Sequence, residues 1–211
     1  VGIRATAPNG IWHIDTTVIR LLDGTRAYLH AVIDIFSRRI LSWRLNDHFD
    51  SGTSADLLLK AGSGVGDVAE SPMLLADAGV ENRNRTVDEL IESGLLRRVL
   101  AMTEIQFLNC LIEVWWRSLK HNWLFLSQLD SIAKIRRLVA FYVEEHNARL
   151  PHSAFRGQTP NEIYSGTGTG SPMSWPQPNR TPAGGDSRSI GRRSAPFAPE
   201  TLSTAIHEGV P

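Results

Sequence analysis

The chain has 211 residues, of which 42% are hydrophobic and 21% charged, and its 22 Lys and Arg residues balance its 22 Asp and Glu residues. This composition is typical of a globular protein built around one domain of ordinary size. The sequence shows neither a signal peptide nor an apolar run of the roughly 18 to 20 residues that cross a bilayer, so we expect no membrane partner and a cytoplasmic location.

The single cysteine and the local charge narrow the class of protein further. Cys110 excludes an internal disulfide framework and a CxxC-type zinc site, and its apolar context indicates a buried structural thiol. The zero net charge argues weakly against a nucleic-acid partner, but residues 97–137 carry seven basic and only three acidic side chains. Because the first residue is Val1 rather than Met, we expect the sequence to be a fragment of a longer protein.

The first third of the chain is rich in β-forming residues. Short connections between three such segments predict an antiparallel meander. These segments are residues 11–19, 27–36 and 38–45. A helix is expected next, over residues 51–62, with Ser51 or Ser54 as its N-cap and glycines at its end.

The middle of the chain alternates strands with helices. A continuous apolar run at 71–77 predicts a buried strand, with Pro72 confined to its first positions. The helix expected at 86–94 has a capping-box pattern from Thr86 to Glu89 and ends at a glycine. The remaining predicted elements are a strand at 95–101 and amphipathic helices at 105–122 and 130–148.

This order of elements matches a ribonuclease-H-like α/β fold, in which three antiparallel strands and then two parallel strands form one mixed sheet flanked by helices. We expect residues 1–125 to form the core and residues 126–165 to pack a C-terminal helix and segment on it. Residues 166–211 are rich in Gly, Pro, Ser and Thr, which predicts a flexible tail. The glycines at 61–66 follow a helix and precede a strand, the reverse of a phosphate-binding loop, so this stretch is interpreted as a linker.

Three carboxylates lie within or beside apolar segments of the chain. Asp15 lies within an apolar strand, where an unpaired carboxylate costs several kcal/mol to desolvate, and it shares a strand face with His13 and Thr17. Asp77 ends the next buried strand, and Glu113 lies beside the apolar stripe of a helix. Each residue alone has an ordinary explanation, such as capping for Asp77, whereas together the three favour a cation site.

The helix around Glu113 presents a polar face of mixed charge. Asn109, Arg117 and Lys120 lie four residues before, four after and seven after Glu113, which places them on nearly the same face. The ordinary interpretation is a solvated surface with one ion pair between Glu113 and Arg117. The alternative is a functional face, and the helix alone does not decide between them.

The spacing of the three acids, in its sequence context, resembles a known family. Between Asp77 and Glu113 lie 35 residues, which gives the pattern D, D-35-E. Over residues 8–165 the chain resembles the catalytic core of insertion-sequence transposases and retroviral-type integrases, the DDE recombinases. The resemblance rests on the segments "PNGIWHIDTTVIRL", "LHAVIDIFSRRILSW", "LLADAGVEN", "NCLIEVWWRSLK" and "FYVEEHNARLPHSAFRGQTPNEIY".

The resemblance implies a chemistry and its partners. Asp15, Asp77 and Glu113 would be catalytic and would hold two Mg²⁺ ions, for which Mn²⁺ can substitute, with Asp15 bridging both. The implied reaction is cleavage and transfer of DNA strands at the ends of a mobile element, by a homo-multimer on double-stranded DNA. Lys120 would contact DNA phosphate, and Asn109 and Arg117 would touch DNA or orient the acid. The implied setting is bacterial, with the enzyme on the nucleoid when it acts.

Other residues receive structural interpretations or mark departures from the family pattern. His13 is interpreted as a structural histidine, Trp115 and Trp116 as core residues, and Arg149 and His152 as packing residues of the C-terminal motif. Ala78 and Leu108 replace residues that are more usual in the family, and its amino-terminal helix-turn-helix is expected to be missing. Two alternatives therefore stay open: a catalytically inactive DNA-binding or assembly module, and a nuclease that only hydrolyses DNA.

Overall fold

The computed structural model describes residues 4–50, 52–65, 71–76, 85–94, 96–100 and 106–168, with the backbone alone at 85–87, 98–100 and 106–110. These residues belong to one compact unit, Val1–Ser171. Most of the tail predicted at 166–211 lies outside the described residues, so its flexibility stays a prediction. None of the described helices is long and apolar enough to cross a membrane.

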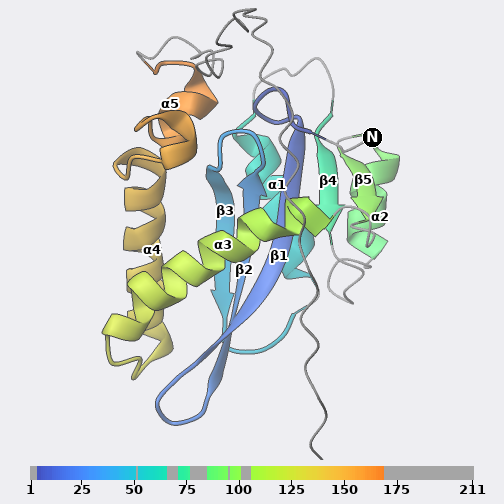
Figure 1. The fold of residues 1–211 in the computed structure, drawn as a ribbon. Helices are drawn as coiled ribbons and strands as arrows, with labels where there is room; N and C mark the ends of the chain where they lie inside the picture. Colours follow the sequence, from blue (N-terminus) through green and yellow to red (C-terminus); the bar gives the residue numbers. More distant parts are fainter. Residues whose placement is uncertain are drawn as a thin grey trace, which may run out of the picture. The chain divides into compact units, whose positions relative to one another are not determined.

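The described strands form a five-stranded mixed sheet in the order β3-β2-β1-β4-β5 (Figure 1). The meander consists of β1 (Ile11–Arg20), β2 (Arg26–Asp34) and β3 (Ile40–Asn46), which pair antiparallel. The strands β4 (Met73–Ala76) and β5 (Arg97–Leu100) run parallel to β1 and to each other. The predicted ribonuclease-H-like sheet is therefore confirmed, with β1 at its centre.

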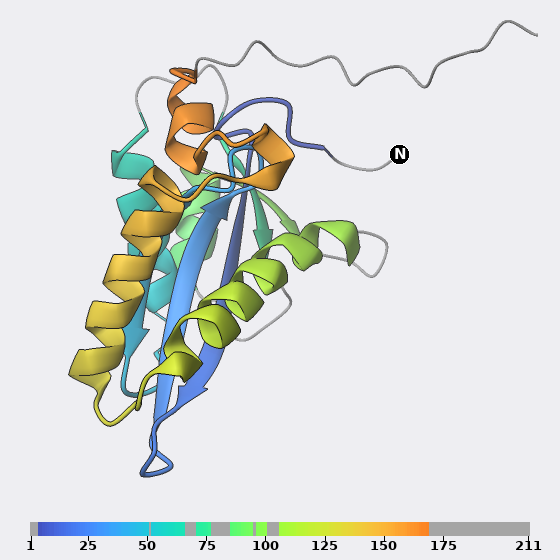
Figure 2. The ribbon, with the colours of Figure 1, turned by 60° about the vertical axis from the view of Figure 1, so that its left-hand side comes forward.

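Helices cover both faces of this sheet (Figures 1 and 2). On one face lie α1 (Thr53–Ser63) and α2 (Arg85–Glu92), and on the other lie α3 (Gln106–Asn122) and α4 (Ile132–Ala148). The remaining described helices are the short turns η3 (Leu124–Leu126) and η4 (Ser153–Phe155) and the last helix, α5 (Pro160–Ser165).

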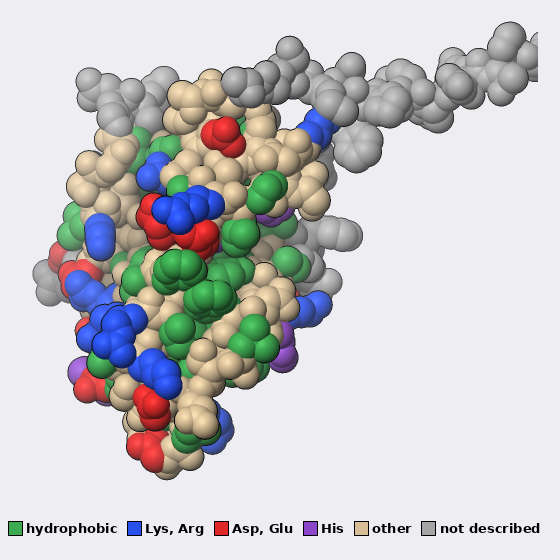
Figure 3. Space-filling view, turned by 90° about the vertical axis from the view of Figure 1, so that its left-hand side faces the viewer, with side chains coloured by type: hydrophobic (Ala, Val, Ile, Leu, Met, Phe, Trp, Pro, Cys, Tyr) green, Lys and Arg blue, Asp and Glu red, His purple; other side chains and the backbone are tan. Residues whose placement is uncertain are grey.

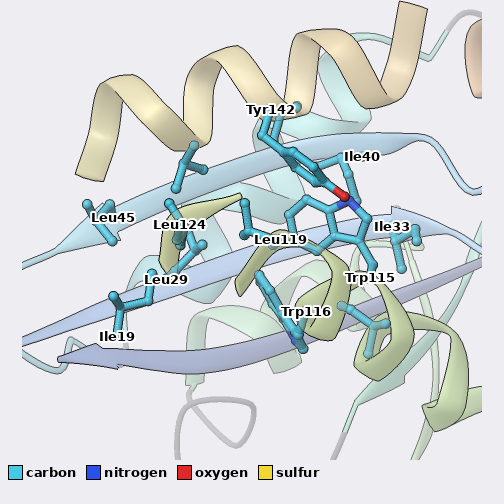
Figure 4. Close-up of a cluster of buried hydrophobic side chains, with 14 of the residues drawn as sticks. Ile19, Leu29, Ile33, Ile40, Leu45, Trp115, Trp116, Leu119, Leu124 and Tyr142 are labelled. Carbon is cyan, nitrogen blue, oxygen red and sulfur yellow. The ribbon is translucent and has the colours of Figure 1, made fainter. Parts of the chain in front are cut away.

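The alternation of side chains along β1 feeds a hydrophobic core on each face of the sheet. Trp12 and Ile14 point to the α1 face, where they pack with Leu57 and Leu58. The opposite core, shown in Figure 4, joins Ile19, Leu29 and Ile33 of the sheet to Trp115, Trp116 and Leu119 of α3 and to Tyr142 of α4. Both tryptophans are nearly buried, at 4% and 6% exposure, which confirms their assignment to the core.

The start of α1 differs from the prediction. Ser54 is not the N-cap, because it lies inside the first turn of the helix and is fully buried; Ser51 is outside the described residues. The N-cap position is Gly52, and no side chain caps the helix; the Asp50 carboxylate accepts hydrogen bonds from Gly52 N (2.9 Å) and Thr53 Oγ1 (3.1 Å) in the turn before it. The prediction is therefore wrong for Ser54 and stays untested for Ser51.

The other predicted caps have mixed outcomes. The helix α2 begins at Arg85, one residue before Thr86, and the side chain of Thr86 lies outside the described side chains, so its capping box stays a prediction. The helix α4 is capped by Ser131, whose hydroxyl accepts from Lys134 N. A complete capping box, formed by Thr159 and Glu162, opens α5.

The end of α4 is tied to the edge strand β3 and to the loop before it. Asn147 accepts a hydrogen bond from Ile40 N and donates one to Ile40 O, both at 2.9 Å. His146 Nε2 lies 2.9 Å from Arg38 O. By contrast, Arg149 pairs with Glu145 inside the same helix. Figure 3 views the molecule from the side of α4, where hydrophobic side chains gather between charged ones.

The ring of His152 serves the turn that follows α4. Its Nδ1 accepts a hydrogen bond from Ala154 N (3.2 Å), which makes it the N-cap of η4, and the ring contacts Phe155. In this segment Asn147 bonds to β3 and His146 to the loop before it, whereas the role described for His152 is local.

Candidate active site

The carboxylate of Asp15 lies where β1 meets α3. One of its oxygens, Oδ2, accepts a hydrogen bond from Trp116 Nε1 (2.8 Å), and Oδ1 accepts one from the amide of Thr16 (2.7 Å). The half-buried carboxylate is thus held by a helix donor and by its own strand. These two bonds, one to each carboxylate oxygen, orient the group.

One turn further along α3, a lysine makes a second bond to β1. Lys120 Nζ donates to Thr17 Oγ1 (2.6 Å), so Thr17 and Asp15 share the strand face that the sequence predicted. Burial lowers the pKa of the Lys120 ammonium below its usual value of 10.5, and the Asp15 carboxylate opposes this shift by favouring the charged form. A cation and a carboxylate therefore lie close together on this side of the sheet.

Glu113 lies on the same polar face of α3. It precedes Trp116 by three residues and Lys120 by seven, which places it one turn from the helix donor that contacts Asp15. Its side chain is exposed, as is that of Arg117. The ion pair between Glu113 and Arg117 that an ordinary surface would show is not among the ion pairs of the described residues.

The remaining predicted site residues lie outside the described positions. Asp77 follows directly after β4, whose last residue, Ala76, pairs with Ile14 of β1. The backbone of Asn109 belongs to α3, but its side chain is not described, and the same holds for Cys110. Within the described ranges no three His, Cys, Asp or Glu residues form a group that could hold a metal ion. The three-carboxylate site therefore stays a prediction.

Two residues of this site were missed in the sequence. The sequence favours the core for Trp116, with base stacking by one of the two tryptophans as the alternative, and it places Thr17 only on a strand face, yet both residues form hydrogen bonds at the site. A signal for Trp116 does exist, because a buried indole N–H usually finds an acceptor. Its neighbour Trp115 illustrates the exception, since Trp115 Nε1 is buried with no partner in the described part of the chain.

His13, two residues before Asp15, is 1% exposed and lies in the interior of the sheet. The residues beside it on β2 and β4 are Ile33 and Leu75, both buried apolar residues. This environment supports the interpretation of His13 as a structural residue.

The sequence is similar to a known protein family and to two transposases. Residues 5–100 match the family described as Integrase core domain. The putative transposase InsK for insertion sequence element IS150 of Escherichia coli (strain K12) is 25% identical over 164 residues, which cover 78% of this chain and 57% of the relative. The transposase for insertion sequence element IS904 of Lactococcus lactis subsp. lactis (strain IL1403) is 24% identical over 163 residues, 76% of this chain and 63% of the relative. The chain thus spans about three fifths of these relatives.

Solved structures show the same fold at low sequence identity. The HTLV-2 integrase catalytic core domain in complex with magnesium is 21% identical, with a TM-score of 0.60 over 76% of this chain and 99% of that one. The catalytic core domain of BIV integrase is 14% identical, with a TM-score of 0.57 over 75% of this chain and 95% of that one.

Proposed function

We propose that this chain, which matches the integrase core domain over residues 5–100 and is similar to insertion-sequence transposases, cuts DNA strands and joins them to new partners in a metal-dependent reaction. The observation that carries the proposal is the bond between Trp116 and Asp15. It fixes a half-buried carboxylate on the central strand, beside the helix that presents Glu113.

The donor chemistry at this position suits a hard divalent cation. The proposed ligands are Asp15, Glu113 and Asp77, and all three offer carboxylate oxygens, which Mg²⁺ and Mn²⁺ prefer. Two of them lie on β1 and α3, which are in contact, and Asp77 follows the strand that pairs with β1. When bound, a pair of such ions would activate the attacking oxygen and stabilise the leaving one.

The protein groups around these acids have distinct proposed tasks. Trp116 and the Thr16 amide hold Asp15 in one orientation, so that its oxygens are preorganised to bind a cation. Lys120, held by Thr17, would bind a phosphate oxygen of the DNA beside the reacting bond. Arg117 is exposed on the same helix and would contact the DNA backbone, and Asn109 would do so or orient the acid.

The proposed substrates are the double-stranded ends of a mobile element and a target duplex, which a homo-multimer would hold together. Support for this comes from the relatives, which are named as transposases of insertion sequences. The enzyme would then be a polynucleotidyl transferase.

The proposal is tested by strand transfer with a fluorescent duplex end and a target duplex, in Mg²⁺ or Mn²⁺. We expect joined products with the wild type and none with Asp15→Asn, Asp77→Asn or Glu113→Gln, while circular dichroism shows intact folding. A matched control is Glu144→Gln, because Glu144 is also an exposed helix carboxylate but lies on α4, and it should keep wild-type activity.

Other outcomes of the strand-transfer assay would contradict the proposal or favour one of the two alternative functions. A triad variant with near wild-type activity contradicts the role of that residue. Cut but unjoined products identify a nuclease, and DNA binding without any metal-dependent cutting identifies an inactive assembly module. Calorimetry of Mg²⁺ or Mn²⁺ binding with wild type and Glu113→Gln, in the presence of a short branched DNA, tests the metal site independently of turnover.

A further inference from the structure

Two arginines face each other at the end of the β1–β2 hairpin. Arg20 and Arg26 are the last register pair of these antiparallel strands, and both are exposed. Like charges directly opposite each other destabilise a strand pair. The nearest carboxylate in the hairpin, Asp23, accepts a hydrogen bond from Thr25 N (2.9 Å), and in the described part of the chain no ion pair engages either arginine. The pair therefore fits an external anion.

An exposed aromatic side chain lies beside the arginine pair. Arg20, Arg26, Val18 and Phe125 line one open hollow of about 350 Å³. Phe125 is 53% exposed and Val18 41% exposed, so the hollow combines two exposed apolar side chains with two basic ones. Aromatic rings that stack bases, combined with cations that bind the backbone, are the usual means of holding an unpaired nucleic-acid strand.

The ring of Phe125 is held in place by its surroundings. It packs edge-on against His121, with ring centroids 5.3 Å apart and an angle of 90° between the planes. The neighbouring residue in η3, Leu124, is fully buried in the core and anchors the turn. A ring that is fixed in this way loses little conformational entropy when a base stacks on it.

The hollow and Asp15 lie along the same strand, β1, whose edge opposite β2 is partly open among the described strands. Among the described strands, β4 pairs only with residues 11–14 of β1, so the edge from Asp15 to Arg20 has no strand beside it. Beyond that stretch, Leu22 N donates to Leu129 O (3.0 Å), which places the loop after η3 against the same edge. In Figures 1 and 2 the hairpin end projects beyond the helices.

The open edge explains how residues from both faces of the sheet meet in one hollow. Val18 and Arg20 point to the face opposite Asp15 and Thr17, whereas Phe125 follows directly after α3. Arg20 lies five positions after Asp15, or roughly 17 Å away at the rise of a strand. That length corresponds to a few nucleotides of a DNA strand.

We propose that Phe125, Arg20 and Arg26 form a binding site for an unpaired segment of DNA, a few nucleotides from the bond that reacts at Asp15. One base stacks on the Phe125 ring, and the two guanidinium groups bind backbone phosphates. The inference rests on the proposed function, for which it supplies a strand-holding site: a strand end freed by cutting stays on the enzyme until it is joined.

The test is fluorescence anisotropy with a labelled single-stranded 15-mer and its blunt duplex, over a series of KCl concentrations in EDTA. For the double variant Arg20→Ala, Arg26→Ala we expect weaker binding of the single strand. The slope of log K against log salt should become shallower by about 1.4, because each lost phosphate contact contributes about 0.7. Arg137→Ala, an exposed arginine on α4, is the control and should leave the slope unchanged.

The aromatic part is tested with Phe125→Ala, Phe125→Trp and the control Leu126→Ala. We expect Phe125→Ala to weaken single-strand binding about fivefold or more, with the salt slope and duplex binding unchanged, and Phe125→Trp to bind as the wild type does. Leu126 is 77% exposed in the same turn and its substitution should have no effect. The inference is overturned if Phe125→Ala and Leu126→Ala behave alike, if duplex binding falls equally, or if the double arginine variant keeps the wild-type slope. Since EDTA prevents chemistry, these outcomes are independent of the strand-transfer test.

Discussion

Adjacent tryptophans allow the bond to Asp15 to be measured separately from packing. Trp115 and Trp116 are both nearly buried, and their ring centroids lie 4.6 Å apart. Trp116 Nε1 donates to Asp15, whereas Trp115 Nε1 has no partner among the described residues. Substitution of either by Phe removes an indole N–H and a similar amount of buried apolar surface. The comparison of Trp116→Phe with Trp115→Phe therefore isolates the hydrogen bond.

The expected difference follows from the charge on the acceptor. A hydrogen bond to an ionised group contributes about 1.5 to 3 kcal/mol, and its loss leaves the half-buried carboxylate with one donor fewer. The Trp115→Phe change costs packing, but it also removes a buried donor that lacks a partner, which offsets part of that cost. We expect the free energy of unfolding to be lower in Trp116→Phe than in Trp115→Phe by about 1.5 to 3 kcal/mol.

The assay is equilibrium unfolding in urea at neutral pH, followed by circular dichroism, with strand-transfer rates measured on the same preparations. Loss of a residue that orients a metal ligand typically lowers metal affinity or activity by about tenfold to a hundredfold, so Trp116→Phe should show a rate loss in that range and Trp115→Phe should not. Equal stability losses in the two variants would refute the assigned role of the Trp116 bond.

Two further predictions concern stability. Burial lowers the pKa of His30 from 6.5 to about 4, so the unfolded chain binds more protons between these values and the protein loses stability as the pH falls through that window. Between about pH 8 and pH 5, protonation of His30 should lower the free energy of unfolding by about 2 kcal/mol, and His30→Gln should remove this part of the pH dependence. The measurement is urea unfolding of both proteins at a series of pH values, and an equal pH dependence in the two would contradict the prediction. Asn147→Ala breaks two bonds to Ile40 and should cost about 2 kcal/mol, whereas Asn122→Ala, which breaks one exposed bond of 3.3 Å, should cost less than about 0.5 kcal/mol. Equal unfolding midpoints for the two Asn variants would contradict this.

The sheet was predictable because its signals are local. Alternation of apolar and polar residues identifies β1, and a continuous apolar run identifies β4, which is buried from both sides. The cap of α1 was not predictable, because the stretch from Asp50 to Ser54 offers several side chains that can cap a helix. The N-cap position falls at Gly52, which depends on how the chain leaves β3, and local sequence does not specify that.

The candidate site was predictable only in part. Helical periodicity places Glu113, Arg117 and Lys120 on one face, and strand alternation places Thr17 beside Asp15. The contact of Trp116 with Asp15 depends on the angle at which α3 crosses the sheet, and no pattern along the sequence encodes that angle. For the same reason the hollow beside Phe125 was not foreseen, since it needs an open strand edge as well as its four lining residues.

The bonds from α3 to β1 join residues that are far apart along the chain. Trp116 and Asp15 are 101 positions apart, and Lys120 and Thr17 are 103 apart, whereas the meander pairs neighbours through short turns. Contacts of such high sequence separation carry a larger loop-closure cost than the turns of the meander do. During synthesis, the strands of the meander are therefore available to pair before Trp116 and Lys120 can bond to β1. Under the proposed function, the site around Asp15 is complete only when α3 has docked on β1.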